Sequence, residues 1–484
     1  MAELADKRKF YIDGAWVDPA EARDLEVIDP TTEEPFAVIS VGGQADTDRA
    51  VAAAKAAQPG WAATPPAERL AFAERLLDVY KRRNDDVAHA MTCEMGAPTD
   101  MSRNDQADSG SFHIETFINS FRDFEFIRPL GDHAPTSMVA WEPVGVVALI
   151  TPWNWPMNQV TLKVIPAILA GNSVVLKPSE IAPISSMVFA EMVHEAGLPP
   201  GVFNLVNGDG AGVGTQLSTH PDVDMVSFTG STRAGIAITK AAADTLKKVA
   251  LELGGKGANV VFADADDKAV TRGTRHVFYN SGQSCNAPTR MLVERSFYEQ
   301  AIETAKRVAE ETTVGSAHEP GKHIGPVVSK QQWDKIQGLI QTGIDEGARL
   351  VAGGPGLPEG VNRGYFVRPT VFADVSPDMT IFRQEIFGPV LSITPFDTEE
   401  EAVELANDTI YGLTNYVQTQ DGARRNRLAR QLKAGMIEMN GVSRGRGSAF
   451  GGVKASGRAR EGGVWGLEEF MDSKQISGWD ADAE

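Results

Sequence analysis

The sequence predicts an α/β fold built on a parallel sheet, because short apolar runs alternate with helical stretches between residues 144 and 262. The apolar runs, such as VGVVALI at 144–150, lack polar–apolar alternation, which is typical of strands buried on both faces. Strand–helix alternation implies right-handed crossovers and parallel strands. We expect strands at 144–150, 173–176, 202–206, 225–228, 249–253 and 259–262, and helices at 156–170, 185–196, 212–218 and 232–243.

The chain has 484 residues, which is more than one hydrophobic core usually supports, so two or three domains are expected. Amphipathic helices are expected at 50–57 and 67–83, before the first sheet. Residues 122–143 have the pattern of an extended or hairpin excursion away from the sheet. A second series of strands and helices is expected from about residue 266 to 440, and the tail at 466–484 is short and acidic.

Composition excludes several classes of function. The formal net charge of −19 disfavours nucleic-acid binding, because such a surface repels phosphate backbones. Two cysteines, Cys93 and Cys285, are too few for a disulfide framework and fit a reducing compartment. No apolar run is long enough to span a membrane, and none follows the first charged residues as in a signal peptide. We therefore expect a cytoplasmic protein, and without a Cys/His cluster we expect no metal site.

Cys285 is the first candidate catalytic residue. It lies in NSGQSCN at 280–286, after an expected helix at about 267–279, and its small polar neighbours suggest a turn that exposes the thiol. The alternative is a buried core cysteine, which is common. For Cys93, inside the helical run at 88–95, the core interpretation is favoured.

Glu252 and Asn154 are candidates of the same kind. Glu252 ends an apolar strand that opens into Gly254 and Gly255, where an unpaired carboxylate is costly to bury. It is either an ion-paired structural residue or a base whose pKa burial raises. Asn154 follows an expected central strand, so its amide could donate to a developing oxyanion or simply stabilise a turn.

Three further segments have features of an anion- or ribose-binding site. Lys177 and Glu180 follow a strand and could hold a ribose, or belong to a solvated loop with Ser179 as a helix cap. The segment GSTRAG at 230–235 opens a helix, where backbone N–H groups favour a phosphate. The glycine-rich GDGAGVG at 208–214 departs by one position from a dinucleotide fingerprint. Glu385 could accept a hydrogen bond from a ribose hydroxyl or be structural.

Taken together, seven motifs resemble the aldehyde dehydrogenase superfamily along nearly the whole chain. They are TPWNWP at 151–156, KPSE at 177–180, FTGST at 228–232, ELGGK at 252–256, GQSC at 282–285, EIFGPV at 385–390 and FGGVKASG at 450–457. The resemblance implies a Rossmann-like parallel-sheet cofactor domain (1–121 and 144–253), an α/β catalytic domain (254–455) and a small β oligomerisation arm (122–143 and 456–484). It also implies a homodimer or homotetramer.

The resemblance assigns roles residue by residue. Cys285 is the implied nucleophile, Glu252 the general base and Asn154 an oxyanion-hole donor. An aldehyde would be oxidised through a thioester on Cys285. NAD is the preferred cofactor, because Glu180 would repel a 2′-phosphate, although Lys177 leaves NADP possible. The implied cofactor-binding residues are Ile150, Thr151, Trp153, Lys177, Ser179, Glu180, Gly210, Gly214, Phe228, Gly230, Ser231, Leu253, Gln332, Lys335, Glu385 and Phe387.

The substrate pocket is where this sequence departs most from the family. Ala449 replaces the proline that often precedes FGG, and the segment at 440–449 is unusually basic and glycine-rich. Arg444 and Arg446 could bind a small aldehyde that carries a carboxylate, such as a semialdehyde, or could pair with acidic surface groups. The implied pocket residues are Trp155, Gln159, Leu162, Ser284, Asn286, Arg444 and Phe450.

Three rival functions follow from the same residues. A non-catalytic descendant of the fold would be expected to lack Cys285, Glu252 or Asn154, and all three are present. A thiol hydrolase without redox chemistry would not need the Lys177–Glu180 segment and would normally place a histidine beside the cysteine. A relative that passes the acyl group to coenzyme A would generally lack the base Glu252.

Overall fold

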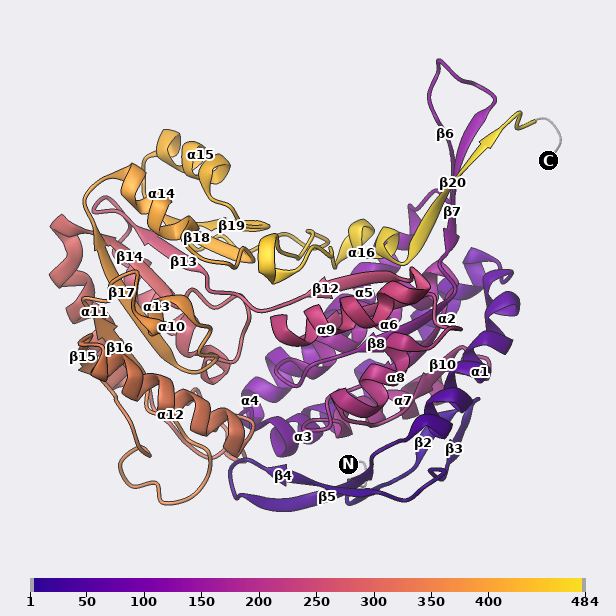
Figure 1. The fold of residues 1–484 in the computed structure, drawn as a ribbon, viewed down its shortest axis with the longest axis horizontal. Helices are drawn as coiled ribbons and strands as arrows, with labels where there is room; N and C mark the ends of the chain where they lie inside the picture. Colours follow the sequence, from indigo (N-terminus) through magenta and orange to yellow (C-terminus); the bar gives the residue numbers. More distant parts are fainter. Residues whose placement is uncertain (1–3, 481–484) are drawn as a thin grey trace.

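The computed structural model describes residues 4–480, and it has two lobes and a protruding arm (Figure 1). Residues 1–3 of the expected cofactor domain and residues 481–484 of the expected arm lie outside the described residues. Each lobe is built on one seven-stranded sheet, and the arm and an N-terminal sheet have three strands each. Among residues 4–480 no helix is both long and apolar enough to cross a bilayer.

The first lobe contains the expected parallel sheet, in the order β12-β11-β8-β9-β10-β2-β3. Adjacent parallel strands run in register, with Ile150 of β8 opposite both Lys177 of β9 and Phe228 of β11. β2 adds to the edge antiparallel to β10. The bounds are β2 Phe10–Ile12, β3 Ala15–Val17, β8 Val146–Ile150, β9 Ser173–Lys177, β10 Phe203–Leu205, β11 Met225–Thr229 and β12 Lys248–Glu252.

Helices cover both faces of this sheet, which explains why its strands carry no polar alternation. In β8, Val147 and Leu149 pack on one helix layer, while Val146, Ala148 and Ile150 pack on the other. The first layer comprises α2 Pro66–Arg82, α3 Asn84–Met95, α5 Asp108–Arg122, α6 Pro156–Ala170 and α7 Ile184–Glu195. The second comprises α1 Gln44–Ala62, α8 Thr215–Thr219 and α9 Thr232–Ala242. The short α4 Thr99–Met101 and the π-helix η1 Ser102–Ala107 connect α3 to α5.

The second lobe contains the sheet β15-β16-β17-β14-β13-β18-β19. One sequence expectation is wrong in detail here: the strand at 259–262 does not close the first sheet. β13 pairs with β14 and β18 instead, because the chain crosses between the lobes through the glycines at 254, 255 and 257. The strands are β13 Ala258–Val261, β14 Arg290–Glu294, β15 Arg349–Ala352, β16 Thr370–Ala373, β17 Val390–Phe396, β18 Thr414–Gln418 and β19 Met436–Met439.

This second sheet is also a three-layer sandwich. Helices α10 Ala269–Phe278 and α11 Tyr298–Glu311 pack on one face. Helices α12 Lys330–Asp345, α13 Thr380–Arg383, α14 Glu399–Asn407 and α15 Gly422–Gln431 pack on the other. Consecutive side chains of β14 therefore pack in different cores. Leu292 belongs to the core beneath α12, and Met291 and Val293 belong to the core beneath α10.

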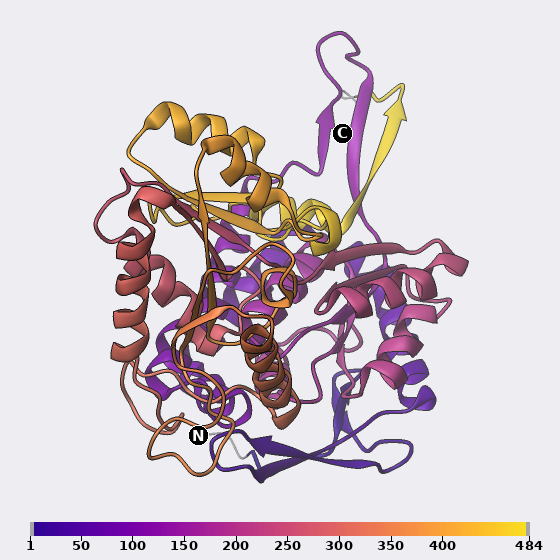
Figure 2. The ribbon, with the colours of Figure 1, turned by 60° about the vertical axis from the view of Figure 1, so that its left-hand side comes forward.

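The arm is a three-stranded antiparallel sheet that stands away from both lobes (Figures 1 and 2). Its strands are β6 Ile127–Pro129, β7 Ser137–Pro143 and β20 Met471–Ser477, so it joins segments from distant parts of the chain. Helix α16 Gly463–Glu469 lies at its base and contacts α5 and α6. The N-terminal sheet has the strands β1 Asp6–Lys7, β4 Asp24–Asp29 and β5 Glu34–Ser40.

A buried carboxylate holds two helices of the first lobe together. Glu94 of α3 is fully buried and accepts hydrogen bonds from the N–H groups of Ile184 (2.5 Å) and Ser185 (3.0 Å), the first residues of α7. These N–H groups have no partner within their own helix, so Glu94 takes the place of a capping side chain. Burial raises the pKa of Glu94 to about 7, against the lowering effect of these hydrogen bonds.

Replacing Glu94 with alanine should therefore destabilise the first lobe. Glu94→Ala leaves two buried N–H groups without an acceptor, which should cost about 2–4 kcal/mol in the free energy of unfolding. Urea unfolding followed by circular dichroism measures this, with the exposed Glu303→Ala as control, for which the change should stay within about 0.5 kcal/mol. Equal midpoints for the two variants would contradict the capping role.

Candidate active site

Four parallel strands end along one edge of the first sheet, and most candidate residues lie just beyond these ends. β8 is followed by Asn154, β9 ends at Lys177, β11 is followed by Gly230, and β12 ends at Glu252. The carboxyl ends of parallel strands are the usual place for ligands in open α/β sheets. Ile150 and Phe228 are buried at the ends of neighbouring strands, and the Thr151 N–H donates to the Lys177 carbonyl at 3.1 Å.

A cavity of about 230 Å³ lies at this edge, between the two lobes. Cys285 lines it together with Asn154, so the fold brings together two segments that lie 131 positions apart in the sequence. The cavity also collects candidates from both lobes. Its other lining residues are Pro152, Trp153, Thr229, Gly230, Ser231, Leu253, Gly254, Gln332, Lys335, Glu385 and Phe387.

The loop that carries Cys285 has an unusual backbone. After α10, Asn280, Ser281 and Gly282 all have positive φ (53°, 54° and 74°). Only glycine fits at position 282, because a Cβ there would lie 2.0 Å from the Gly388 carbonyl oxygen. Two hydrogen bonds hold the Asn280 side chain. Its Nδ2 donates to the carbonyls of Asn154 (3.0 Å) and Gln283 (3.2 Å). Such strain persists only where the surroundings enforce it.

Asn154 is oriented toward the same loop. Its Nδ2 donates to the Gln283 carbonyl at 3.0 Å, and its side chain is buried. A buried amide with one donor hydrogen engaged keeps its second N–H for another acceptor. The amide therefore stands beside Cys285 as a fixed donor in the lining of the cavity.

The Cys285 thiol is only partly exposed, and its environment disfavours the thiolate. Burial raises the pKa of Cys285 to about 12, with further raising by the carboxylates of Glu385 and Glu252. Arg444 acts in the opposite direction. In this state the sulfur is a neutral thiol at neutral pH, so a nearby positive charge or base has to shift that balance.

Glu252 is fully buried at the end of β12 and does not line the Cys285 cavity. Neither of its carboxyl oxygens has a hydrogen-bond partner within residues 4–480. Burial raises its pKa well above the usual value, and the neighbouring Glu461 raises it further. The carboxyl fits closely against Gly451 (φ 154°), where a Cβ would lie 2.7 Å from Oε1.

Sequence reasoning missed a buried ion pair beside Glu252. Lys163 of α6 and Glu461 form a salt bridge in which both side chains are almost inaccessible. Lys163 lowers the pKa of Glu252, while Glu461 raises it. Lys163 is the one charged residue in the apolar helix at 156–170, and a charge in that position is a signal that could have identified it.

The carboxylate of Glu385 connects the two lobes at this cavity. Its Oε1 accepts a hydrogen bond from the Gly255 N–H at 2.7 Å, and a Cβ at Gly254 would lie 2.4 Å from Oε2. Burial raises the pKa of Glu385, while that N–H and the nearby Lys335 and Lys256 lower it. Beside it, the Phe387 ring packs edge-on against Trp153 at 5.4 Å, and Gln332 Nε2 donates to the Phe387 carbonyl at 2.8 Å.

The Lys177 group lies at the end of β9, outside the Cys285 cavity. Lys177 Nζ is buried, donates to the carbonyls of Pro178 and Gly208 and lies 3.5 Å from the Glu180 carboxylate, which is about one-third exposed. Burial lowers the pKa of Lys177, and Glu180 raises it. Ser179 Oγ accepts from the Ile181 N–H rather than starting the next helix. Gly210 and Gly214 bound the π-helix η2 Gly210–Gly214 beside this lysine.

A second cavity, of about 270 Å³, is lined by Asn286, the residue that follows Cys285. Five of the sequence candidates for the substrate pocket line it: Gln159, Leu162, Asn286, Arg444 and Phe450. Its remaining polar lining comes from side chains that the sequence did not single out, chiefly His113, Asn158 and Glu438.

The two arginines of the basic segment differ. Arg444 lines the second cavity, with Nε on Glu438 (3.1 Å) and its guanidinium over the Phe450 ring. Arg446 is exposed and pairs with Glu115 at 3.0 Å, and it does not line the cavity. Both arginines pair with acidic residues, which was one of the two alternatives, and of the two only Arg444 also lines the second cavity.

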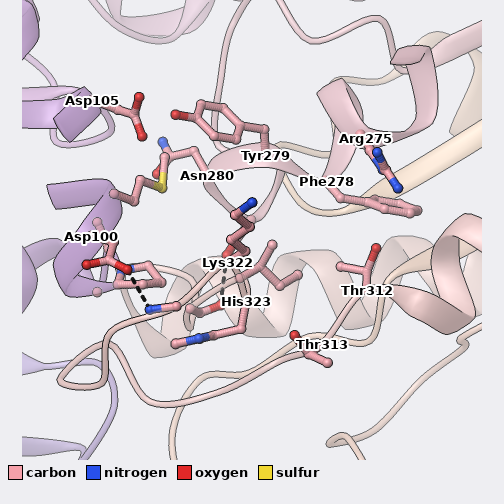
Figure 3. A pocket seen from close by; sticks show the side chains of 18 of the residues that line it. Asp100, Asp105, Arg275, Phe278, Tyr279, Asn280, Thr312, Thr313, Lys322 and His323 are labelled. Carbon is pink, nitrogen blue, oxygen red and sulfur yellow. Dashed lines mark hydrogen bonds between the residues drawn. The ribbon is translucent and has the colours of Figure 1, made fainter. Parts of the chain in front are cut away.

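Trp155 and Ser284 line neither of these two cavities. Trp155 Nε1 donates to Ser284 Oγ at 2.8 Å, and its ring packs 6.0 Å from Tyr279. Beyond Tyr279 lies a larger cleft of about 720 Å³, shown in Figure 3 with Asp105, Lys322 and Arg275 in its walls. Cys285, Glu252 and Asn154 are absent from its lining, so this cleft is not the reactive site.

Comparison with known proteins gives a consistent result. A 3-succinoylsemialdehyde-pyridine dehydrogenase from Pseudomonas sp is 47% identical over 479 residues, covering 99% of this chain and all of that protein. The crystal structure of an aldehyde dehydrogenase from Bartonella henselae is 62% identical, with a TM-score of 0.98 over 98% of this chain and all of that one. The structure of aldehyde dehydrogenase C from Pseudomonas syringae with NAD+ and octanal is 45% identical, with a TM-score of 0.96 over 98% and 97% of the two chains.

The family assignment follows from these matches together with the site. The model of the aldehyde dehydrogenase family matches residues 16–476, which includes every candidate residue from both lobes. The fold agrees with this match. The chain therefore belongs to the aldehyde dehydrogenase family.

Proposed function

We propose that this aldehyde dehydrogenase oxidises an aldehyde to its carboxylic acid through a thioester on Cys285, with NAD+ as hydride acceptor. The observation that carries the proposal is the cavity in which Cys285 and Asn154 meet Glu385 and the N-terminus of α9. A nucleophile, an oxyanion donor and polar groups suited to a dinucleotide line one space. The NAD+ complexes of related structures support this choice of cofactor.

The residues around the first cavity fit a nicotinamide dinucleotide. Gly230 and Ser231 lie at the start of the 11-residue helix α9, where N–H groups and the helix dipole favour a phosphate. Thr229 Oγ1 is buried in the same wall and has no hydrogen-bond partner in the described part of the chain. Gly254 leaves open the space that a Cβ would fill next to Glu385. Glu385 and Phe387 would hold the nicotinamide ribose, and Lys177 and Glu180 the adenosine ribose.

The first half of the reaction belongs to Cys285 and Asn154. The Cys285 thiol first loses its proton, to a base or to water, and the thiolate sulfur then bonds to the aldehyde carbon while the carbonyl π electrons move onto oxygen. Asn154 Nδ2, with the backbone N–H of Cys285, donates to that oxyanion, a contribution of about 3–4 kcal/mol for one donor in comparable sites. When bound, NAD+ accepts the hydride from this carbon. The C=O bond then re-forms and leaves a thioester on Cys285.

The second half belongs to Glu252. Burial raises the pKa of Glu252, which favours its neutral form, and it acts as a base only as the carboxylate. As carboxylate it takes a proton from a water whose oxygen attacks the thioester carbon. The C–S bond breaks, and the acid and the Cys285 thiolate are released. Because this base is present, water is the proposed acceptor of the acyl group rather than coenzyme A.

The substrate is proposed to be an aldehyde with a polar tail. The name of the Pseudomonas relative includes a semialdehyde, and Arg444 lines the cavity beyond Asn286 in this chain. A semialdehyde that carries a carboxylate is one candidate. The salt bridge between Arg444 and Glu438 argues against such a substrate, because Glu438 already neutralises the positive charge of Arg444.

The units of the chain are proposed to follow the three sheets with their helices. The cofactor domain would comprise 1–121 and 144–253, the catalytic domain 254–455, and the oligomerisation arm 122–143 and 456–484. Within the arm, Ile127 and Leu130 are large apolar side chains that are 43% and 48% exposed. We propose that they meet a second copy in a homodimer or homotetramer. A cytoplasmic location is proposed from the two free cysteines.

Removing the base should trap the thioester. Glu252→Gln should slow steady-state turnover by about 10²–10⁴-fold, while a first burst of NADH remains. Intact-mass spectrometry should then find the acyl group on Cys285. In the wild-type enzyme, single-turnover hydrolysis of the thioester should become faster as the pH rises, because Glu252 has a raised pKa and forms the carboxylate base only at higher pH. Hydrolysis at the wild-type rate in Glu252→Gln would rule out this role.

Cofactor preference should depend on Glu180. The wild-type enzyme should have a higher kcat/KM for NAD+ than for NADP+, because the carboxylate repels a 2′-phosphate by roughly 1–4 kcal/mol at a distance of about 4 Å. Glu180→Ala should raise kcat/KM for NADP+ about tenfold, and the distant Glu303→Ala should leave the ratio unchanged. Equal use of both cofactors by the wild-type enzyme, or no change in the variant, would refute the assignment.

The arm should determine the oligomeric state. Light scattering should give a multiple of the 52.0 kDa subunit for the wild-type protein. Placing charges on the arm with Ile127→Glu and Leu130→Glu should shift the mass toward a monomer, because carboxylates would be buried unpaired. Leu350→Glu, on the exposed strand β15, is the matched control and should not change the mass. A monomeric wild-type protein would contradict the proposal.

A further inference from the structure

The cavity beyond Cys285 has a defined polar wall. It lies next to Asn286 and has a volume of about 270 Å³, room for roughly nine water-sized groups at about 30 Å³ each. Leu162, Phe112 and Phe450 supply its apolar lining. A group that enters from the Cys285 side therefore meets apolar side chains together with the amides of Asn158 and Gln159.

The orientation of these amides follows from a short chain of hydrogen bonds. Asn158 Nδ2 lies 2.9 Å from His113 Nε2, and because an amide NH₂ group only donates, Nε2 accepts in the tautomer that carries its hydrogen on Nδ1. Burial lowers the pKa of His113 to about 3, which keeps the ring neutral. Asn158 Oδ1 is then free to accept from Gln159 Nε2 at 3.4 Å. The chain fixes Gln159 with its NH₂ group toward Asn158.

The other end of the Gln159 amide has no hydrogen-bond partner. Its Oε1 is buried without a donor from any residue in the range 4–480, and the side chain is 5% exposed. A buried acceptor left unpaired costs free energy that a ligand recovers by donating to it. Gln159 is one helical turn after Trp155 in α6, so its side chain is held by a rigid element.

Arg444 supplies hydrogen-bond donors. Its Nε donates to the Glu438 carboxylate at 3.1 Å, and one Nη makes a weak 3.5 Å contact with the Met436 sulfur. The remaining guanidinium N–H groups have no acceptor among the residues the structure describes. Because Glu438 balances the charge, the cavity offers donors without a net positive charge. A neutral acceptor suits this arrangement better than a carboxylate, which Glu438 would repel.

We propose that Gln159 selects aldehydes whose far end carries a neutral group that both donates and accepts hydrogen bonds, such as a carboxamide or hydroxyl. The group donates to Gln159 Oε1 and accepts from Arg444. Gln159 is thus a specificity-determining residue for the substrate tail. This inference rests on the proposed aldehyde oxidation at Cys285 and names the substrate class for it.

The test compares two aldehydes of nearly the same shape. 4-Formylbenzamide and 4-acetylbenzaldehyde differ by an NH₂ in place of a CH₃, so only the first can donate to Gln159. With wild-type enzyme and NAD+, kcat/KM should be about tenfold higher for the amide. Gln159→Leu should bring that ratio close to one, and Gln300→Leu, on the exposed face of α11, should keep the wild-type ratio.

Two further measurements separate the contributions. Arg444→Met should lower kcat/KM for both compounds together, because both accept, and leave their ratio unchanged. 4-Formylbenzoate, the anionic analogue, should be a poorer substrate than the amide. A wild-type preference for the benzoate, an amide-to-acetyl ratio near one, or an unchanged ratio in Gln159→Leu would each overturn the proposal.

A general failure of turnover is distinguishable from a failure of this inference. If hexanal reduces NAD+ in the presence of the enzyme but none of the three aromatic aldehydes does, the tail selection is wrong and the proposed function stands. If no aldehyde, hexanal included, reduces NAD+, the proposed function itself falls and this inference falls with it.

Discussion

The parallel register of β12, β11, β8 and β9 is the constraint on which the site depends. These strands are paired residue by residue, so their carboxyl ends meet along one edge. Asn154, Lys177, Ser231 and Glu252 all follow from that register, since each lies at or just after a strand end. The second lobe then brings one loop, with Cys285, to the same edge. A slip of one residue in β9 or β12 would turn Lys177 or Glu252, the last residues of those strands, to the opposite face.

The sequence predicted five of the seven strands of the first sheet, β8 to β12, because short apolar runs between helical stretches are typical of strands buried on both faces. The short edge strands β2 and β3 were not predicted. The helix expected at 156–170 has those bounds in the structure. The strand at 259–262 was assigned to the wrong sheet, since local pattern does not tell which strands pair. Glycines at 254, 255 and 257 were the signal for a crossing between lobes, but glycine alone fits a turn equally well.

Among the site residues, those in motifs were the easiest to find. Cys285, Asn154 and Glu385 lie in short segments of unusual composition, and the structure brings them to one cavity. Glu461, His113 and Glu438 matter through long-range contacts that no local pattern shows, whereas the lone charge of Lys163 in an apolar helix was a local signal that sequence reasoning missed. Arg444 and Arg446 look equivalent in the sequence. Both are exposed, and only the structure shows that Arg444, paired with Glu438, lines the cavity while Arg446 pairs with Glu115 outside it.

The close contact between Gly282 and the Gly388 carbonyl has a consequence for protein engineering. It joins the loop of the reactive sulfur to the segment that carries Glu385 and Phe387, with no side chain in between to absorb a shift. Displacement of either segment is therefore passed directly to the other. Attempts to widen the aldehyde channel through this loop would disturb dinucleotide affinity at the same time, whereas changes on α6 at Gln159 would leave the two properties separable.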